Sequence, residues 1–291
     1  MFNTKYVKFK EKVTTELVDV QKIICNSILI EEFLKEPVLK FLNAPSKKIR
    51  IVLPIFYLKA LGEEITEKHL KLFSALEIVH NASLIHDDII DDGKVRRGET
   101  AIYKKFGNKL GVIAGDYLLS VAMGILSEIN STEIFKIFSK ALKQMCIGEI
   151  NQNYNLYKIG SIEEYIEKSK NKTAYLFETA MFCSVLLCNK QYNINEVRNF
   201  GLNFGIAFQI RDDLLNIMNK DFSKQSNDVE EGIYNAPVIY SDGVENLSQG
   251  IEKTHILLNN YVDSAIEALN ILPKNDYKSA LIKITELLKD D

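Results

Sequence analysis

The sequence has few of the features that mark secreted, membrane or metal-cluster proteins. Its four cysteines, Cys25, Cys146, Cys183 and Cys188, show no metal-ligand spacing, so we expect free thiols in a reducing compartment. No run approaches the ~20 uninterrupted apolar residues of a membrane span. The N-terminal MFNTKYVKFKEKV has charges where a signal peptide has an apolar core. We therefore expect a cytoplasmic protein with no membrane span.

An excess of charge of one sign is also lacking. The 291 residues include 36 Lys and Arg against 39 Asp and Glu, which gives a net charge of −3. This balance argues against nucleic acid as a partner, because nucleic-acid-binding surfaces are strongly basic. The hydrophobic share of 46% and the charged share of 26% are ordinary for a globular protein.

Proline is scarce, and alternating strand patterns are absent. Only five prolines occur, and apolar residues recur at three- and four-residue spacing along most of the chain. The pattern predicts helices almost throughout, among them 66–92, 98–106, 109–128, 131–157, 161–169, 172–189, 193–218 and 236–271, the last in one piece or two. The polar residues 219–235 are the main predicted loop. Since no linker separates domains, we predict a single all-α domain over residues 1–291.

An acidic cluster follows the apolar pattern of the helix predicted over 66–92. Four aspartates lie within six residues: Asp87, Asp88, Asp91 and Asp92. Aspartates that are four residues apart share one helix face, where like charges destabilise a helix by a few tenths of a kcal/mol per pair. A divalent cation relieves this repulsion, and hard Mg²⁺ prefers carboxylate oxygens. Arg96 and Arg97 lie directly downstream, so the cluster predicts a site for a highly charged anion such as diphosphate.

A second acidic pair lies far along the chain. Residues 208–216 read FQIRDDLLN, and Asp212 and Asp213 again end an apolar helical run. A single such motif would more simply be an exposed acidic helix end. Two of them on two helices can face each other and hold a metal-bridged diphosphate, which is our prediction.

With both motifs in place, the sequence resembles the trans-prenyltransferases, or all-trans polyprenyl diphosphate synthases, most closely the long-chain octaprenyl-type bacterial enzymes. The resemblance covers roughly residues 46–237 in matching order, and the DDGKVRRG continuation of the first motif is highly specific. It implies the isoprenoid synthase fold, a bundle of long helices around a deep apolar cavity. It also implies a homodimer that uses Mg²⁺ to condense isopentenyl diphosphate head-to-tail with an allylic diphosphate.

The resemblance assigns roles to the matching positions. The residues implied for isopentenyl diphosphate are Lys47, Arg50, His80 and Arg97, and those for the allylic diphosphate are Arg96, Lys172 and Lys224. The implied metal residues are Asp87, Asp88, Asp91, Asp212 and Asp213. Near the bond-forming carbons it implies Lys172, Thr173 and Gln209, and it matches Gly148, Glu149 and Gln152 to a helix that lines the cavity. Taken alone, His80 is more simply a hydrogen-bonded core residue.

The second motif departs from the family pattern. Asn216 stands where the family has a third aspartate, and Ile233 stands where it has a lysine. Asp212 is the residue expected to contact metal directly, and a neutral amide at 216 can still act through water. We therefore expect activity to survive, with weaker binding of metal and of the allylic substrate.

Ala82 and Ser83 bear on product length. They lie one helical turn, ~5.4 Å, before the first aspartates. Family members that stop at short products usually have a bulky aromatic residue at one of these places, and both residues are small here. We predict a long product, hexaprenyl to octaprenyl or longer, that extends along this helix.

Three alternatives remain at this point. A short-chain farnesyl or geranylgeranyl diphosphate synthase is possible if another helix closes the tunnel. The altered second motif also fits a weakly active or regulatory subunit of a heteromeric synthase, although the intact first motif argues against it. A terpene cyclase is disfavoured, because Glu231 and Asn235 stand where its second motif requires serine and glutamate.

Overall fold

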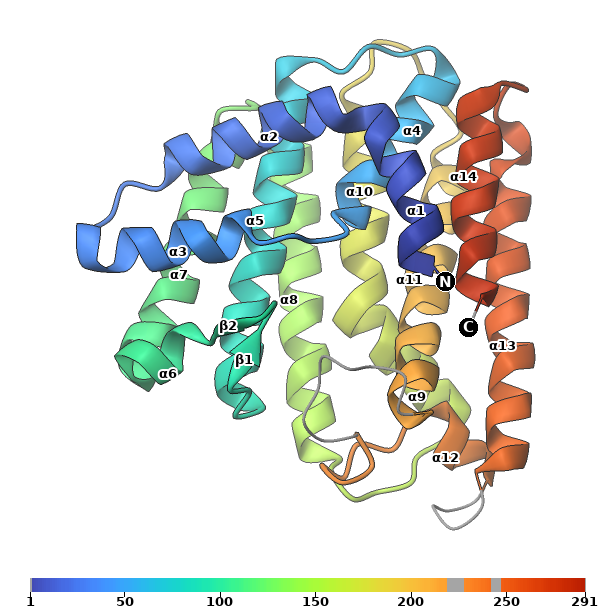
Figure 1. Ribbon diagram of the computed structural model, residues 1–291. Helices are drawn as coiled ribbons and strands as arrows, with labels where there is room; N and C mark the ends of the chain where they lie inside the picture. Colours follow the sequence, from blue (N-terminus) through green and yellow to red (C-terminus); the bar gives the residue numbers. More distant parts are fainter. Residues whose placement is uncertain (1, 219–227, 242–246, 291) are drawn as a thin grey trace. The chain divides into compact units, whose positions relative to one another are not determined.

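The computed structural model describes residues 2–218, 228–241 and 247–290, and nearly all of them are helical (Figure 1). Strands β1 (Val95–Arg96) and β2 (Glu99–Thr100) form one antiparallel pair, the only sheet in these ranges. The prediction of an all-α protein is confirmed. The helices fall into two compact units, and we describe each by itself. That the chain is a single domain stays a prediction.

The α5 unit comprises Lys10–Ile55 and Glu64–Phe135. Its elements are η1 (Glu11–Val13), α2 (Thr14–Ser27), α3 (Glu32–Asn43), the first half of α4 (Ile49–Leu61), α5 (Glu67–Ile90), the β1–β2 pair, α6 (Ile102–Phe106) and α7 (Asn108–Ser127). Within this unit α5 packs along α7 and α2 (Figure 1). The first acidic cluster therefore lies at the end of the unit's central helix.

The limits of α5 follow from local chemistry. Thr66 and His69 form a capping box, in which the Thr66 N–H donates to His69 Nδ1 at 3.1 Å. At the other end the Gly93 N–H donates to the Asp88 carbonyl at 2.8 Å and closes the last turn. The chain then returns through β1 and β2. The helix predicted from residue 98 is wrong at its start, since Glu99–Thr100 is a strand and α6 begins at Ile102.

The α11 unit comprises Met1–Phe9, Phe56–Glu63 and Lys136–Asp291. Its elements are most of α1 (Phe2–Lys10), the second half of α4, most of α8 (Thr132–Tyr154), α9 (Ile162–Ser169), the π-helical turn η2 (Lys170–Ala174), α10 (Tyr175–Leu186), α11 (Ile194–Ile217), α12 (Ala236–Ser241), α13 (Ser248–Ala268), η3 (Leu269–Ile271), α14 (Asp276–Glu286) and η4 (Leu287–Lys289).

Helix α11 is the centre of this unit and packs against α10 and α13 (Figure 1). Phe177 of α10 lies between Phe204 and Phe208 of α11, with ring centroids 5.4 and 5.6 Å away. Such aromatic pairs add to the hydrophobic stabilisation that their burial gives. This apolar wall fixes α11 immediately before the second acidic pair.

Helix α7 is the one described helix long and apolar enough to cross a membrane by length and composition. A core helix of a globular protein passes the same test, and α7 packs against α5 and α6. Its residues Val112 and Ile113 are nevertheless 44% and 55% exposed. Helix α7 therefore combines a packed face with an exposed apolar face.

Candidate functional site

The aspartates at the end of α5 differ in their surroundings. Asp87 is partly exposed and Asp91 is exposed, whereas Asp88 is only 2% exposed. The Asp88 Oδ1 accepts two hydrogen bonds from the Arg96 guanidinium, from Nε at 2.8 Å and from Nη2 at 2.6 Å. Burial raises the pKa of Asp88, and Arg96 opposes that rise. Asp88 is thus engaged within the protein, and Asp87 and Asp91 offer the more accessible carboxylates.

The residues predicted to bind isopentenyl diphosphate lie partly together in the α5 unit. Arg50 Nη1 lies 3.1 Å from His80 Nε2. Because a guanidinium only donates, Nε2 accepts this bond and the ring proton is on Nδ1. Arg97 Nη1 donates to Asn81 Oδ1 at 2.9 Å, one residue from His80. Lys47 is half-buried three residues before Arg50.

The electrostatics of this cluster are those of an anion site. Burial, followed by the charges of Arg50, Arg97 and Arg96, lowers the pKa of His80 well below its ordinary value. His80 is therefore neutral at physiological pH. The positive charges that face it are ready to balance a diphosphate.

Sequence reasoning missed Glu77, which is 3% exposed on α5. Its Oε1 has no hydrogen-bond partner among the described residues. Burial raises its pKa, and the surrounding charges of Lys48, Arg50 and Arg97 counteract this effect. The sequence signal that could have indicated Glu77 as a site residue is its acidic side chain within the apolar run ALEIVHNA. Glu77 places one buried carboxyl among the cations of the predicted anion site.

In the α11 unit, the structure brings Thr173 and Gln209 together with Asp213. Thr173 Oγ1 donates to Gln209 Oε1 at 2.5 Å, and Gln209 Nε2 donates to Asp213 Oδ1 at 2.9 Å. Tyr165, which the sequence did not single out, donates its hydroxyl to Asp213 Oδ2 at 2.6 Å. Asp213 is 4% exposed, while its neighbour Asp212 is partly exposed. The second acidic pair therefore shows the same division into a buried and a partly exposed aspartate.

Lys172 is held by helix α8. Its Nζ lies 2.9 Å from Glu149 Oε2. Gly148 allows the close approach of α8 to the Lys172 main chain, because a Cβ at position 148 would lie 2.9 Å from the Lys172 main-chain nitrogen. These contacts give Gly148 and Glu149 a concrete role in placing Lys172.

Asn216 is 4% exposed, and its Oδ1 accepts the Asp228 N–H at 2.8 Å. The amide oxygen thus bonds directly to the main chain, and its action through water stays a prediction. Ile233 also closes this turn, donating its N–H to the Asp228 carbonyl at 2.7 Å. The predicted diphosphate ligand Lys224 lies outside the described residues.

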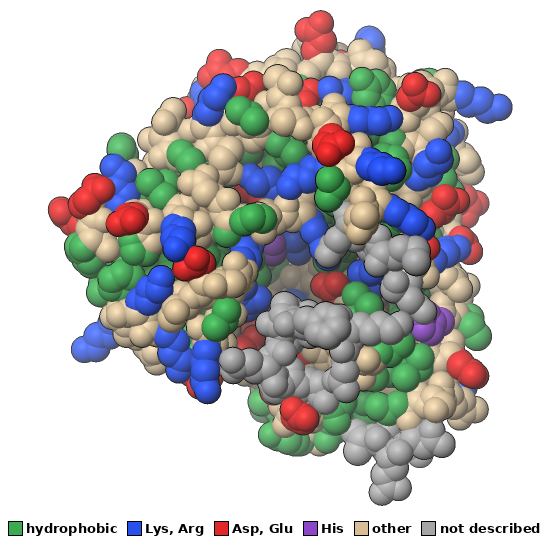
Figure 2. All heavy atoms as spheres, viewed as in Figure 1, with side chains coloured by type: hydrophobic (Ala, Val, Ile, Leu, Met, Phe, Trp, Pro, Cys, Tyr) green, Lys and Arg blue, Asp and Glu red, His purple; other side chains and the backbone are tan. Residues whose placement is uncertain are grey.

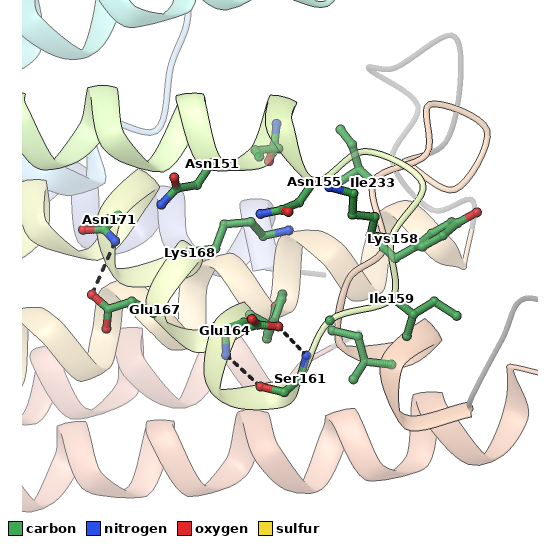
Figure 3. A pocket seen from close by; sticks show the side chains of 15 residues that line it. Asn151, Asn155, Lys158, Ile159, Ser161, Glu164, Glu167, Lys168, Asn171 and Ile233 are labelled. Carbon is green, nitrogen blue, oxygen red and sulfur yellow. Dashed lines mark hydrogen bonds between the residues drawn. The ribbon is translucent and has the colours of Figure 1, made fainter.

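A pocket of about 500 Å³ lies in the α11 unit between the end of α8, α9 and the segment that precedes α12 (Figure 3). Asn151, Asn155 and Lys168 are among its polar lining residues, and Ile159 and Ile233 are among its apolar ones. This mixed lining differs from the apolar cavity that the resemblance implies.

Among residues 2–218, 228–241 and 247–290, no group of three or more His, Cys, Asp and Glu side chains could hold a metal ion. This does not argue against Mg²⁺, which usually takes one or two carboxylates and completes its octahedron with waters and substrate phosphates. The oxygen donors Asp87 and Asp91, at i and i+4 on one helix end, fit that requirement.

Over the face seen in Figure 2, Lys and Arg side chains are interspersed with Asp and Glu.

Comparison with known proteins identifies the family. Residues 31–269 match the family model for polyprenyl synthetase. A prenyl transferase of Cyanophora paradoxa is 32% identical over 275 residues, which cover 84% of this chain and 85% of that protein. A decaprenyl-diphosphate synthase of Dictyostelium discoideum is 32% identical over 276 residues, 85% of this chain and 60% of that protein.

The fold agrees with this assignment. The structure of a polyprenyl synthase from Caulobacter crescentus CB15, complexed with calcium and isoprenyl diphosphate, matches with a TM-score of 0.89. The two chains are 23% identical, and the match covers 98% of each. The family model and the relatives together lead to one conclusion: this chain belongs to the polyprenyl synthetase family.

Proposed function

We propose that this polyprenyl synthetase condenses isopentenyl diphosphate head-to-tail with an allylic diphosphate to make an all-trans polyprenyl diphosphate, hexaprenyl to octaprenyl or longer. The observation that carries the proposal is the repeated helix end, with one partly exposed aspartate beside one buried aspartate, at Asp87–Asp88 and at Asp212–Asp213. The long product is supported by small residues at Ala82 and Ser83 and by a related decaprenyl-diphosphate synthase.

Mg²⁺ is the proposed metal, with Asp87, Asp91 and Asp212 as its protein ligands. When bound, Mg²⁺ supplies Lewis-acid stabilisation of the negative charge on the diphosphate leaving group. Asp88 and Asp213 act differently in this proposal. Their hydrogen bonds to Arg96 and to Gln209 hold the surrounding side chains in place.

The remaining site residues bind and orient the two substrates. Arg96 and Lys172 are proposed to take oxygens of the allylic diphosphate, which fixed cations stabilise most as charge develops. Arg50, Arg97 and neutral His80 are proposed to hold isopentenyl diphosphate. The allylic C–O bond breaks with its electron pair leaving on diphosphate, and the isopentenyl double bond then forms the new C–C bond. A proton lost to the released diphosphate restores the double bond.

A direct assay tests the proposal. The purified chain is incubated in separate reactions with geranyl or farnesyl diphosphate as the primer, each with labelled isopentenyl diphosphate in excess and Mg²⁺, and the dephosphorylated products are separated by length. We expect all-trans products of hexaprenyl length or longer and no products with EDTA. Lack of incorporation by the isolated chain would favour the regulatory-subunit alternative. Release of farnesyl or geranylgeranyl products alone would favour the short-chain alternative.

A further inference from the structure

Six buried or half-buried polar residues of the α11 unit form a chain of contacts that begins and ends on α11. We call it the Asn216 circuit, and its members are Tyr165, Lys168, Asp213, Asn216, Asp228 and Asn235. It brings together α9, the end of α11 and the turn before α12. None of the substrate-binding roles proposed above uses Lys168, Asn216 or Asn235.

The first half of the circuit runs through α9. Tyr165 donates its hydroxyl to Asp213 Oδ2 at 2.6 Å. Lys168 lies three residues later, with Nζ 5.4 Å from the centre of the Tyr165 ring. The same Nζ donates to Asn235 Oδ1 at 2.7 Å. One lysine therefore contacts both the α9 aromatic ring and the turn before α12.

The second half returns to α11. Asn235 Nδ2 donates to Asp228 Oδ2 at 2.8 Å, and the Asp228 N–H donates to Asn216 Oδ1 at 2.8 Å. Asn216, Asp228 and Asn235 are 4%, 5% and 3% exposed. Buried networks whose members are satisfied favour a single geometry, and breaking one link leaves a buried group unpaired.

Charge explains why an amide suits position 216. The circuit already contains two buried carboxylates, Asp213 and Asp228, and a single cation, Lys168. A third carboxylate at 216 would add a negative charge without a further cation in the circuit, which is costly away from water. The Asn216 amide oxygen accepts the same N–H without adding charge.

We propose that Asn216 is a positioning residue: its amide oxygen holds the main chain of Asp228 and, through the Asn216 circuit, presets residues 228–235 for binding the allylic diphosphate with Mg²⁺. The inference rests on the proposed function and deepens it at the second acidic motif. The competing view makes Asn216 a weak substitute for a metal-binding aspartate. In the structure its oxygen accepts the Asp228 N–H, a main-chain contact that the competing view does not explain.

The first test does not depend on activity. Amide hydrogen exchange at Asp228 is measured in the wild type, Asn216→Leu and Asn216→Asp, with Asn199→Leu, an exposed site on the same helix, as control. We expect exchange at least about fivefold faster in Asn216→Leu, which loses the acceptor, since one hydrogen bond contributes about 1 kcal/mol. The control keeps the wild-type environment and should stay close to the wild type, and Asn216→Asp keeps an acceptor, so its exchange should be slower than that of Asn216→Leu. Unchanged exchange in Asn216→Leu would overturn the proposal.

A second test uses kinetics. We expect Asn216→Leu to raise the KM for farnesyl diphosphate and the half-saturating Mg²⁺ concentration about tenfold while kcat changes less than threefold. Asn216→Asp should not lower the half-saturating Mg²⁺ concentration below the wild-type value. A lower value would overturn the positioning role in favour of a metal-ligand role.

A failure of the variant to fold and a failure of the proposed function can each be distinguished from a failure of the circuit. If Asn216→Leu does not fold, Lys168→Met replaces it, because it removes the bond to Asn235 from a half-buried site on α9. Faster exchange at Asp228 is again the expected result, and unchanged exchange overturns the circuit. A wild-type protein that makes no prenyl product would refute the proposed function, and the exchange experiment would still decide whether the circuit exists.

Discussion

At the residue scale, each pair of adjacent aspartates has two different tasks. Consecutive residues on a helix point about 100° apart, so one of the pair faces outward when the other faces the packed side. Asp88 and Asp213 are the inward members, at 2% and 4% exposure. The sequence analysis predicted metal binding for all four of these carboxylates alike. It could not separate the buried from the exposed ones, because exposure depends on tertiary contacts.

This division gives different expectations for neighbouring substitutions. Asp87→Ala should lower turnover at least about 100-fold, a scale typical of losing one charge-stabilising group, with little change in the free energy of unfolding. Asp88→Ala should lower the free energy of unfolding by about 1–3 kcal/mol, because it removes the buried partner of Arg96. Steady-state kinetics at saturating Mg²⁺ and urea unfolding measure the two effects. Wild-type turnover in Asp87→Ala would contradict its assignment as a ligand.

His80 gives a prediction about pH. Its pKa is lowered in the folded protein by burial and by Arg50 and Arg97, so below pH ~6.5 the unfolded chain binds the extra proton more readily. Stability is therefore complete above that pH and falls on acidification. Between pH 7.5 and 5.5, the wild type should lose about 1 kcal/mol more unfolding free energy than His80→Gln. An NMR titration of the His80 ring with a midpoint near 6.5 would contradict this prediction.

At the element scale, glycines of α7 allow its close contact with α5, and Gly115 is one of them. A Cβ on Gly115 would lie 2.2 Å from His86 Nε2, whereas a Cβ on Gly124, also in α7, would meet nothing within 4 Å. Gly115→Ala should cost about 1–3 kcal/mol of unfolding free energy through overpacking. Gly124→Ala should gain up to about 1 kcal/mol from helix propensity.

Thermal and urea unfolding of both variants test this pair. Because His86 directly precedes Asp87, Gly115→Ala should also lower turnover, and Gly124→Ala should not. Equal stability of the two variants would show that the α5–α7 contact tolerates a methyl group at Gly115.

The elements that the sequence predicted best are the long periodic ones. The helices predicted over 66–92 and 193–218 are α5 (Glu67–Ile90) and α11 (Ile194–Ile217), because long apolar periodicity and the Thr66 cap both show in the sequence. The strands β1 and β2 were missed, since two-residue strands have no alternation to detect. The predicted gap between 169 and 172 is bridged by the π-helical turn η2, which packs against α11.

The candidate site was predictable to a similar extent. Residues with a motif, such as Thr173 and Gln209, were found through the resemblance, and the structure joins them by a hydrogen bond. Tyr165, which bonds to Asp213, and Asn235, which bonds to Asp228, were not predicted as site residues. A side chain that acts through a buried tertiary contact has no local pattern, so only the fold reveals it.

At the scale of the whole molecule, the homodimer stays a prediction, and the exposed apolar face of α7 is where we expect the second copy. Exposed patches of this kind often mark interfaces. Val112→Lys with Ile113→Lys should shift the protein from dimer to monomer in light scattering. Ile256→Lys on α13, where the residue is 61% exposed, is the matched control and should leave the mass unchanged. A wild-type monomer would contradict the prediction.

Product length is also a property of the whole molecule, and the structure shows which of the two small residues tests it better. Ala82 is fully buried, so a phenylalanine there should overpack the core at a cost of about 1–3 kcal/mol. Ser83 is only partly buried, and its Oγ donates to the His80 carbonyl at 2.9 Å. A larger side chain at Ser83 can therefore enter the proposed path of the growing chain while the helix stays folded.

We expect Ser83→Phe to shorten the product to farnesyl or geranylgeranyl length while each condensation step continues, because the aromatic ring would close the path one turn, ~5.4 Å, from Asp87. Ser83→Ala is the control and should keep the wild-type length. Both are measured by separating the dephosphorylated products formed with isopentenyl diphosphate in excess. An unchanged product in a folded Ser83→Phe protein would mean that another helix sets the limit. A wild type that releases only farnesyl diphosphate would refute the long-chain proposal itself.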